Sequence, residues 1–368
     1  MARKLKSDKL LFMATLLLVC TSVVMVYSAS AMLADAKYHQ PYWFLAKQAT
    51  WTVLGLCLLV VTMRIDYRHY REPIVIWTAV GVVGVALVAV LFSAPINGAR
   101  RWLGPGGTGV QPSEAAKLAA IFFTAAILER RMDRIDEVKY ALLPIAIMAG
   151  AFTILIVAEP DYGTAVSLIV IVGAMVFAAG LSYRYLVGLA AVTLPVLGFV
   201  LWSAPYRRAR LLAFLNPWDD PLGDGFQIIQ SLIAVGTGGV FGRGLMGGVQ
   251  KLFYLPEPHT DFIYAVIGEE LGIVGATVIL ACFAVMTWRG LRAAVRAPDR
   301  FGAFLALGLT TMVAFQAFVN ISVVLGLMPT KGIPLPFVSA GGSSLLISLT
   351  GMGILLNVSQ HASSAPDV

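Results

Sequence analysis

The chain alternates long hydrophobic runs with short polar segments, and each run has about the 20 residues that a helix needs to cross a bilayer. Ten such runs cover approximately 10–30, 46–63, 73–92, 113–129, 140–157, 163–181, 185–203, 262–288, 302–326 and 341–357. The pattern predicts an all-α polytopic membrane protein with about ten transmembrane helices, forming a single integral membrane domain over 1–368. A large extracytoplasmic loop, 204–261, is predicted between the seventh and eighth helices.

Composition supports a membrane protein over a soluble one. Hydrophobic residues make up 58% of the chain and charged residues 13%, with a mean hydropathy of +0.82. A soluble globule does not have this composition. The net charge of +7 does not indicate a nucleic-acid partner, because the basic residues lie in short loops between apolar runs.

The distribution of basic residues predicts the orientation of the chain. Sixteen of the 27 Lys and Arg lie in short loops on the side of the N-terminus. By the positive-inside rule, both termini are cytoplasmic and 204–261 is external. The first run is longer than the hydrophobic region of a signal peptide, so an uncleaved first span is expected. The glycine-rich apolar segment 226–249 is interpreted as an interfacial or re-entrant element, not an eleventh span.

Ionisable side chains gather just before and inside the eighth run. Glu257, His259 and Asp261 precede it, and Glu269 and Glu270 follow two turns inside. Ionisable groups beside a hydrocarbon phase are costly and suggest function. Asp261 is the candidate catalytic residue. The alternative is an ordinary helix cap, in which a side chain at 260 or 261 accepts from the first backbone N–H groups.

Other polar groups lie in shorter external segments and have structural alternatives. Glu114 and Lys117 are spaced i, i+3 and can form an ion pair on one face of the fourth helix. Arg101, next to Trp102, is either an interfacial anchor or a cation for a pyrophosphate. Asp161 is expected to cap a tight turn.

The segment 330–344 precedes the last run and contains Lys331 followed by glycines and serines. Helix starts of this kind attract anions, so Lys331 is a candidate phosphate contact. The glycine clusters lack the ending of a phosphate-binding loop, the four histidines lack zinc spacing, and no Gly-x-Ser-x-Gly elbow is present. These absences argue against ATP-driven transport, a zinc site and serine hydrolysis.

The chain resembles the SEDS family of bacterial cell-wall and division membrane proteins (FtsW, RodA, SpoVE). The matching blocks are 24–30 (VMVYSAS), 111–114 (QPSE), 160–164 (PDYGT), 230–234 (QSLIA), 255–263 (LPEPHTDFI), 268–272 (GEELG), 334–339 (PLPFVS) and 341–344 (GGSS). Segments 250–256 and 327–332 look more like the FtsW and SpoVE branch than RodA. Three positions depart from the family pattern: Ala340 stands where Tyr is usual, Glu159 where Gln is common, and Asp224 where a small residue is common.

The resemblance implies a peptidoglycan glycosyltransferase that polymerises lipid II at the outer face of the bacterial cytoplasmic membrane. It implies Asp261 as general base, and it leads us to expect substrate contacts from Arg101, Glu114, Lys117, His259, Lys331 and Ser339. Asp161, Glu257, Glu269 and Glu270 are expected to be supporting residues. A class B penicillin-binding protein and other divisome membrane proteins are the implied partners. No cofactor is implied with certainty, and assistance by Mg²⁺ or Mn²⁺ stays open.

Two alternatives belong to other functional classes: a lipid II flippase and a non-catalytic scaffold for division proteins. A flippase needs polar residues at both faces of its path, and residues such as Glu114, Lys117, Glu269 and Glu270 could line such a path. The chain concentrates its polar residues in the external half, which favours the enzyme. A role in division, elongation or sporulation is not decided by the sequence.

Overall fold

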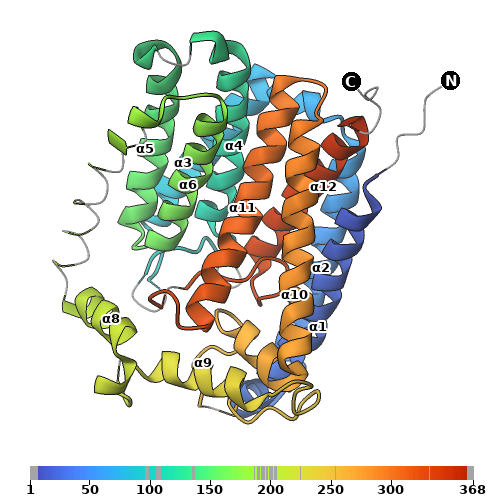
Figure 1. Ribbon diagram of the computed structural model, residues 1–368, viewed down its shortest axis with the longest axis vertical. Coiled ribbons are helices and arrows are strands. Elements are labelled where there is room, and N and C mark those ends of the chain that lie inside the picture. Colours follow the sequence, from blue (N-terminus) through green and yellow to red (C-terminus); the bar gives the residue numbers. More distant parts are fainter. Residues whose placement is uncertain are drawn as a thin grey trace.

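The computed structural model describes the chain except for residues 1–6, 96–98, 105–108, 135–136, 186, 189–190, 192–194, 196–197, 199–201, 203–204, 224, 253, 331 and 363–368. Long helices run roughly parallel to one axis (Figure 1). They are α1 (Lys9–Tyr38), α2 (Trp43–Arg64), α3 (Pro73–Val90), α4 (Pro112–Arg131), α5 (Leu143–Ala158), α6 (Tyr162–Ala178), α10 (Ile263–Val295), α11 (Arg300–Val324) and α12 (Gly342–Ala362).

These helices coincide with nine of the predicted spans, and the fold is the predicted all-α membrane bundle. Among the described residues, seven helices are long and apolar enough to cross a bilayer and α6 is a shorter apolar helix. Helix α4 also coincides with a predicted span but is less apolar. The predicted span 185–203 lies largely outside the described residues. Several helices are longer than their apolar runs. An apolar run ends at the first polar residues, whereas the helical backbone hydrogen bonds extend past them.

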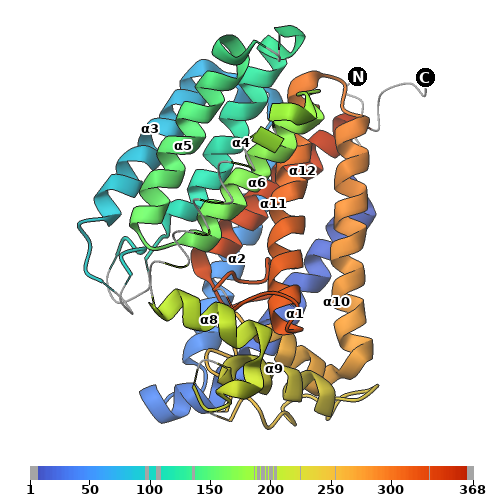
Figure 2. The same ribbon diagram turned by 60° about the vertical axis from the view of Figure 1, so that its left-hand side comes forward.

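Helix α4 is the least apolar of the long helices and is buried along nearly its whole length. It contacts α3, α6 and α11, and Figure 2 shows it behind α3 and α5. A central helix packs against protein instead of lipid, so it can carry polar side chains that find partners inside the bundle. The position of α4 therefore explains how Glu114 and Lys117 are accommodated.

The long connection before α10 contains two further helices, α8 (Pro205–Leu215) and α9 (Phe226–Thr237). Both lie across one end of the bundle, at the bottom of Figures 1 and 2. We call this the loop end. Residues 239–244 then pair with α10, where Gly272 adopts φ 67° and interrupts the helix. A Cβ at Gly272 would lie 2.3 Å from the backbone nitrogen of Gly242, so this approach requires glycine. As predicted for 226–249, α9 lies across the end of the bundle and does not span it.

The opposite end carries both described chain ends, and we call it the terminal end. Gln360 Nε2 donates to Ser7 Oγ at 2.7 Å. Short helical turns connect the helices here: η1 (Tyr67–Arg71), η3 (Met132–Arg134) and η4 (Val138–Leu142). The two termini therefore lie on the same side, as the sequence predicted.

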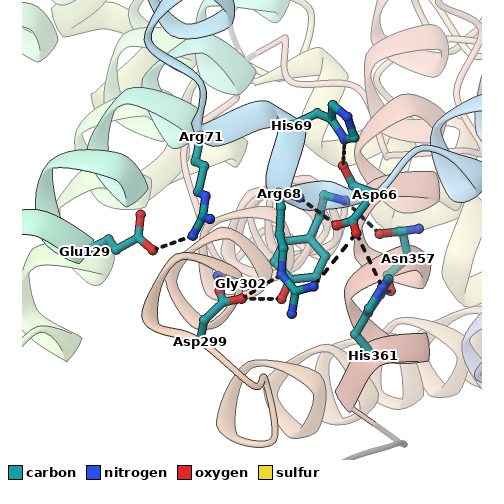
Figure 3. A network of polar contacts seen from close by, with 10 residues as sticks. Asp66, Arg68, His69, Arg71, Glu129, Asp299, Gly302, Asn357 and His361 are labelled. Carbon is teal, nitrogen blue, oxygen red and sulfur yellow. Dashed lines mark hydrogen bonds and ion pairs between the residues drawn. The ribbon is translucent and has the colours of Figure 1, made fainter.

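A polar network joins η1, α11 and α12 at the terminal end (Figure 3). The buried Tyr67 donates its hydroxyl to Asp299 Oδ2 at 2.6 Å, and Asp299 Oδ1 accepts from the N–H of Gly302 at 2.7 Å as the cap of α11. Asn357 accepts from the Tyr67 N–H at 2.9 Å and donates to Met63 O at 2.9 Å. Burial opposes ionisation of Asp299, but these hydrogen bonds and Arg68 hold its pKa below the usual value.

Candidate active site

Asp261 lies in the turn that precedes α10, and its side chain is half-buried. The helix has no side-chain N-cap at its capping position, Phe262. The hydroxyl of Thr260 instead donates to Glu257 O at 3.2 Å. A Cβ at Gly332 would lie 3.0 Å from Asp261 Oδ2. The carboxylate therefore faces the segment before α12, and the structure does not support the helix-cap alternative.

Two hydrogen bonds hold the turn 257–261 against the segment 333–340, and a third orders the segment itself. Ser339 Oγ donates to Thr260 O at 2.6 Å and accepts from the Leu335 N–H at 2.8 Å. The Ala340 N–H donates to His259 O at 2.9 Å. Ser339 was expected to contact substrate, but its only proton is committed to Thr260. Its role in the structure is to position the turn.

Asn320 is a residue of this site that the sequence reasoning missed. Its Nδ2 donates to Asp261 O and to Ile333 O, both at 2.8 Å. It therefore fixes the backbone at Asp261 and the facing segment to α11. Its Oδ1 is buried without a hydrogen-bond partner among the described residues. An amide inside the apolar run 302–326 was the available signal.

A cavity of about 170 Å³ opens between α2, the residues just before Asp261 and the start of α12. Its lining combines aromatic rings with polar groups, among them Trp51, Trp102, Lys47, His259 and Thr260. Ala340 also lines it, so the departure from the family pattern at this position removes a ring from the cavity wall. Lys47 was not singled out from the sequence, although it is a lone lysine one turn inside an apolar helix.

His259 is buried and its ring lies 4.7 Å from that of Phe44, centroid to centroid. Burial lowers the pKa of His259; the charge of Lys47 lowers it further, while Glu257 raises it. The ring is therefore held neutral at ordinary pH. Its Nδ1 has no hydrogen-bond partner within the described part of the chain. Glu257 is largely exposed and lies 3.9 Å from His259 Nε2.

Glu114 and Lys117 form a buried ion pair on α4. Lys117 Nζ lies 2.8 Å from Glu114 Oε1, and the two side chains are 0% and 3% exposed. A pair that is shielded in this way is costly to break, since either charge alone would be left buried. The geometry supports the structural interpretation that the spacing suggested, and direct substrate contact by either residue stays untested.

Arg101 is engaged with the turn between α5 and α6. Its guanidinium donates to Glu159 O at 3.3 Å and to Pro160 O. Asp161 caps α6 by accepting from the Thr164 N–H at 3.3 Å, as predicted. It also accepts from Gln111 Nε2 at 2.9 Å. Arg101 thus holds this turn in place, and its expected contact with a pyrophosphate stays a prediction.

Glu159 lies at the same turn and is fully buried. Neither carboxylate oxygen has a hydrogen-bond partner among the residues that the structure describes. Burial raises the pKa of Glu159 to about 8, with a further increase from Asp161 and an opposing effect of Arg101. The side chain is therefore mostly protonated at neutral pH. A protonated Glu resembles the Gln that is common here in the family.

Glu269 and Glu270 hold the loop 243–251 against α10. Glu269 Oε1 accepts from the Val249 N–H at 2.7 Å. Glu270 Oε1 lies 2.6 Å from Lys251 Nζ and accepts from Ser28 Oγ at 2.7 Å. Both glutamates are fully buried. These contacts fit the supporting role that was expected, and they explain the sequence block 24–30, which supplies Ser28.

Lys331, the third predicted phosphate contact, lies outside the described residues. Metal binding was left open by the sequence. Across the described part of the chain, no group of three or more His, Cys, Asp or Glu side chains could hold a metal ion.

A family model for FtsW, RodA and SpoVE, described as cell cycle proteins, matches residues 8–364. The chain belongs to this family. It is 43% identical to the probable peptidoglycan glycosyltransferase FtsW of Geobacter metallireducens, over 98% of this chain and 96% of that one. It is also 43% identical to the stage V sporulation protein E of Bacillus subtilis, over 98% of this chain and 99% of that one.

Solved structures of the family have the same fold. A chain of a peptidoglycan synthase complex, described for its coordination of polymerization and crosslinking, matches with a TM-score of 0.80. It is 32% identical, over 98% of this chain and 100% of that one. The rod shape determining protein RodA of Thermus thermophilus matches with a TM-score of 0.71 at 28% identity, over 97% of both chains. The resemblance found in the motifs is confirmed.

Proposed function

We propose that this protein is a peptidoglycan glycosyltransferase that polymerises lipid II, with Asp261 as the general base. The observation that carries the proposal is the placement of Asp261. Its carboxylate faces the segment before α12, and the two residues that precede it, His259 and Thr260, line a cavity with aromatic and cationic walls. The backbone around it is held by Asn320 and Ser339. Family members of similar length that are named as probable peptidoglycan glycosyltransferases support the reaction class.

The reaction joins two sugars in a single displacement. A hydroxyl of the acceptor sugar attacks the anomeric carbon of the donor sugar, and the bond from that carbon to the diphosphate breaks. The hydroxyl proton passes to the Asp261 carboxylate, and the electron pair of the broken bond leaves with the diphosphate. The configuration at the anomeric carbon inverts. The protein then needs a carboxylate on one side of the carbon and cations on the other.

The proposed orientation places the loop end outside the cytoplasmic membrane and the terminal end in the cytoplasm. Arg68, Arg71, Arg131, Arg134 and Arg300 surround the short turns at the terminal end, as the positive-inside rule requires of a cytoplasmic face. Cysteine labelling at Asp219, in the turn after α8, tests the orientation. Labelling of Asp219→Cys only from the cytoplasmic side would contradict the proposed placement of the reaction.

The proposed partner is a class B penicillin-binding protein, which would crosslink the glycan product. Support comes from the similar chain found in a peptidoglycan synthase complex, whose description couples polymerization with crosslinking. Other division membrane proteins are proposed as further partners. The flippase alternative has less support, because Glu114, Lys117, Glu269 and Glu270 are engaged in buried contacts.

The test is glycan polymerisation by the purified full chain with lipid II, with and without the transpeptidase partner, read as product length on a gel. Asp261→Asn keeps the shape of the side chain but loses the proton acceptor. We expect it to lower turnover by about 10²–10⁴-fold with an unchanged melting temperature. Near-normal turnover by folded Asp261→Asn would reject Asp261 as the base. Absence of polymer from the wild-type protein with its partner would reject the function.

A further inference from the structure

The leaving group of the proposed reaction is a diphosphate, and the site needs cations to hold it. Two of the cations expected for this role are engaged elsewhere. Arg101 binds the carbonyls of Glu159 and Pro160, and Lys117 is buried in its pair with Glu114. The structure places another cation, Lys47 of α2, in the wall of the cavity that His259 and Thr260 also line.

Lys47 and His259 line the same cavity from two different elements. The charge of Lys47 is near enough to His259 to disfavour protonation of its ring. The ring is 5% exposed, and its Nδ1 lacks a hydrogen-bond partner in the described residues. A lysine and a buried, unsatisfied imidazole nitrogen on one small cavity are well suited to an anionic ligand that bears several oxygens.

The start of α12 is a second source of positive potential. Gly341 and Gly342 line the cavity, and α12 continues for 21 residues. The first N–H groups of a helix have no partner within it, and its dipole favours a negative charge at this end. Trp51 packs directly on the helix start, where a Cβ at Gly342 would lie 2.4 Å from the indole. Glycine is therefore required for this close approach.

The remaining walls suit the sugar that carries the diphosphate. Trp51, Trp102 and Phe44 provide flat apolar surface, and Thr260, next to Asp261 in the chain, lines the same cavity. A diphosphate held by Lys47 would thus lie close to the segment that carries the base. The sequence reasoning missed this arrangement, because α2, the turn 257–261 and α12 are far apart in the chain.

We propose that this cavity binds the diphosphate of the lipid-linked sugar donor, with Lys47 as the principal cation and the start of α12 as the second contact. The identity of the ligand rests on the proposed function. The cationic character of the site rests on Lys47 and the start of α12 at Gly342, which line one cavity with His259.

The test is direct binding of undecaprenyl diphosphate to the purified full chain in nanodiscs. Undecaprenyl phosphate and phosphatidylglycerol serve as comparison lipids. We expect the wild-type protein to bind the diphosphate most tightly. Lys47→Met should weaken this binding about tenfold or more, the scale of a lost hydrogen bond to a charged group. Lys47→Arg should retain most of the affinity. Lys37→Met is the matched control, since Lys37 is an exposed lysine at the end of α1.

A second measurement needs no substitution. Lysine-reactive labelling of the wild-type protein, read by mass spectrometry, should show protection of Lys47 but not Lys37 by undecaprenyl diphosphate. Equal protection of both lysines, or equal affinity for phosphatidylglycerol, would overturn the proposal. Normal diphosphate binding by folded Lys47→Met would also overturn it.

The outcomes separate this proposal from the proposed function. A protein that binds undecaprenyl diphosphate through Lys47 but makes no glycan would keep the diphosphate site and reject the polymerase. A protein that polymerises lipid II with an unchanged KM in Lys47→Met would keep the polymerase and reject the site.

Discussion

Two asparagines at opposite ends of the bundle show how differently the two ends are built. Asn357, at the terminal end, uses both side-chain atoms: it accepts from the Tyr67 N–H and donates to Met63 O. Asn320, toward the loop end, donates to Asp261 O and Ile333 O, but its Oδ1 has no partner in the described structure. The first asparagine completes a network, whereas the second leaves part of its hydrogen-bonding capacity unused.

The polar groups near Asn357 and near Asn320 differ in the same way in how fully they are hydrogen-bonded. Asp299 and Asn357 lie around η1 (Figure 3), and they accept from the hydroxyl and the backbone N–H of Tyr67. Near the candidate site, His259 Nδ1 and both oxygens of Glu159 are buried without partners among the described residues. Unsatisfied buried polar atoms cost stability, and proteins retain them chiefly where function needs them. This difference fits a terminal end built for stability and the binding and chemistry that we propose at the loop end.

The largest expected difference between the two ends comes from replacing each asparagine by leucine and comparing turnover with stability. Asn320→Leu removes the donor that positions Asp261, and a small misplacement of a catalytic group can cost up to about 10²-fold in rate. We expect turnover per folded molecule to fall ~10–100-fold, in addition to a lower melting temperature from the two carbonyls that lose their donor. The assay is lipid II polymerisation per folded molecule, with folded fraction measured by size-exclusion chromatography.

Asn357→Leu is the matched control at the terminal end. It should lower the melting temperature and folded yield, because the Tyr67 N–H and Met63 O lose their partner. Turnover per folded molecule should stay near that of the wild-type protein. If the two variants lost activity and stability in the same proportions, the distinction between the two ends would be wrong.

A smaller effect is expected from Asp299→Asn, which weakens the contacts of Tyr67 and Arg68 with a carboxylate. A hydrogen bond to a charged group contributes about 1.5–3 kcal/mol, so the free energy of unfolding should drop by up to that amount. The folded-state pKa of Asp299 is lowered, so its stabilising effect is present above the unfolded pKa. It is lost as the pH falls through the folded value.

Thermal melts of wild type and Asp299→Asn between pH 3 and pH 7 measure this effect. The difference between the two proteins should be largest at pH 7 and shrink toward pH 3. A constant difference across this range would mean that the charge of Asp299 does not contribute.

Glu159→Gln should change the stability least of these substitutions at neutral pH. At high pH it should make the protein more stable, whereas the other substitutions make it less stable. The pKa of Glu159 is raised to about 8. The contribution of protonated Glu159 to the stability of the wild-type protein is therefore fully present below the unfolded pKa. It is lost as the pH rises through the folded pKa of about 8. Gln cannot ionise, so the variant should be more stable than wild type at pH 9 by ~1 kcal/mol or more.

Melting temperatures at pH 6 and pH 9 test this prediction, with Glu257→Gln as the control at an exposed carboxylate. A wild-type melting curve that did not shift between the two pH values, relative to Glu159→Gln, would show that Glu159 is not held protonated.

Much of the fold was predictable from the sequence, and the candidate site was chosen from it. The helices follow from hydrophobic runs of bilayer length, and the shared side of the two termini follows from the basic loops. The cluster before the eighth run located Asp261, because ionisable groups are rare and costly at such a position. Asp161 was correctly predicted as a cap, since capping depends only on residues in the same turn.

The sequence by itself therefore determined the class of protein, the helices and the candidate base, because each depends on local pattern and local cost. Only the tertiary structure decided the partners of each polar side chain. It gave Arg101 to the carbonyls at 159–160 and Asn320 to the backbone at Asp261. It also placed Lys47 in a cavity with His259. These partners lie on helices distant in sequence, and packing of the bundle brings them together, which no local pattern encodes.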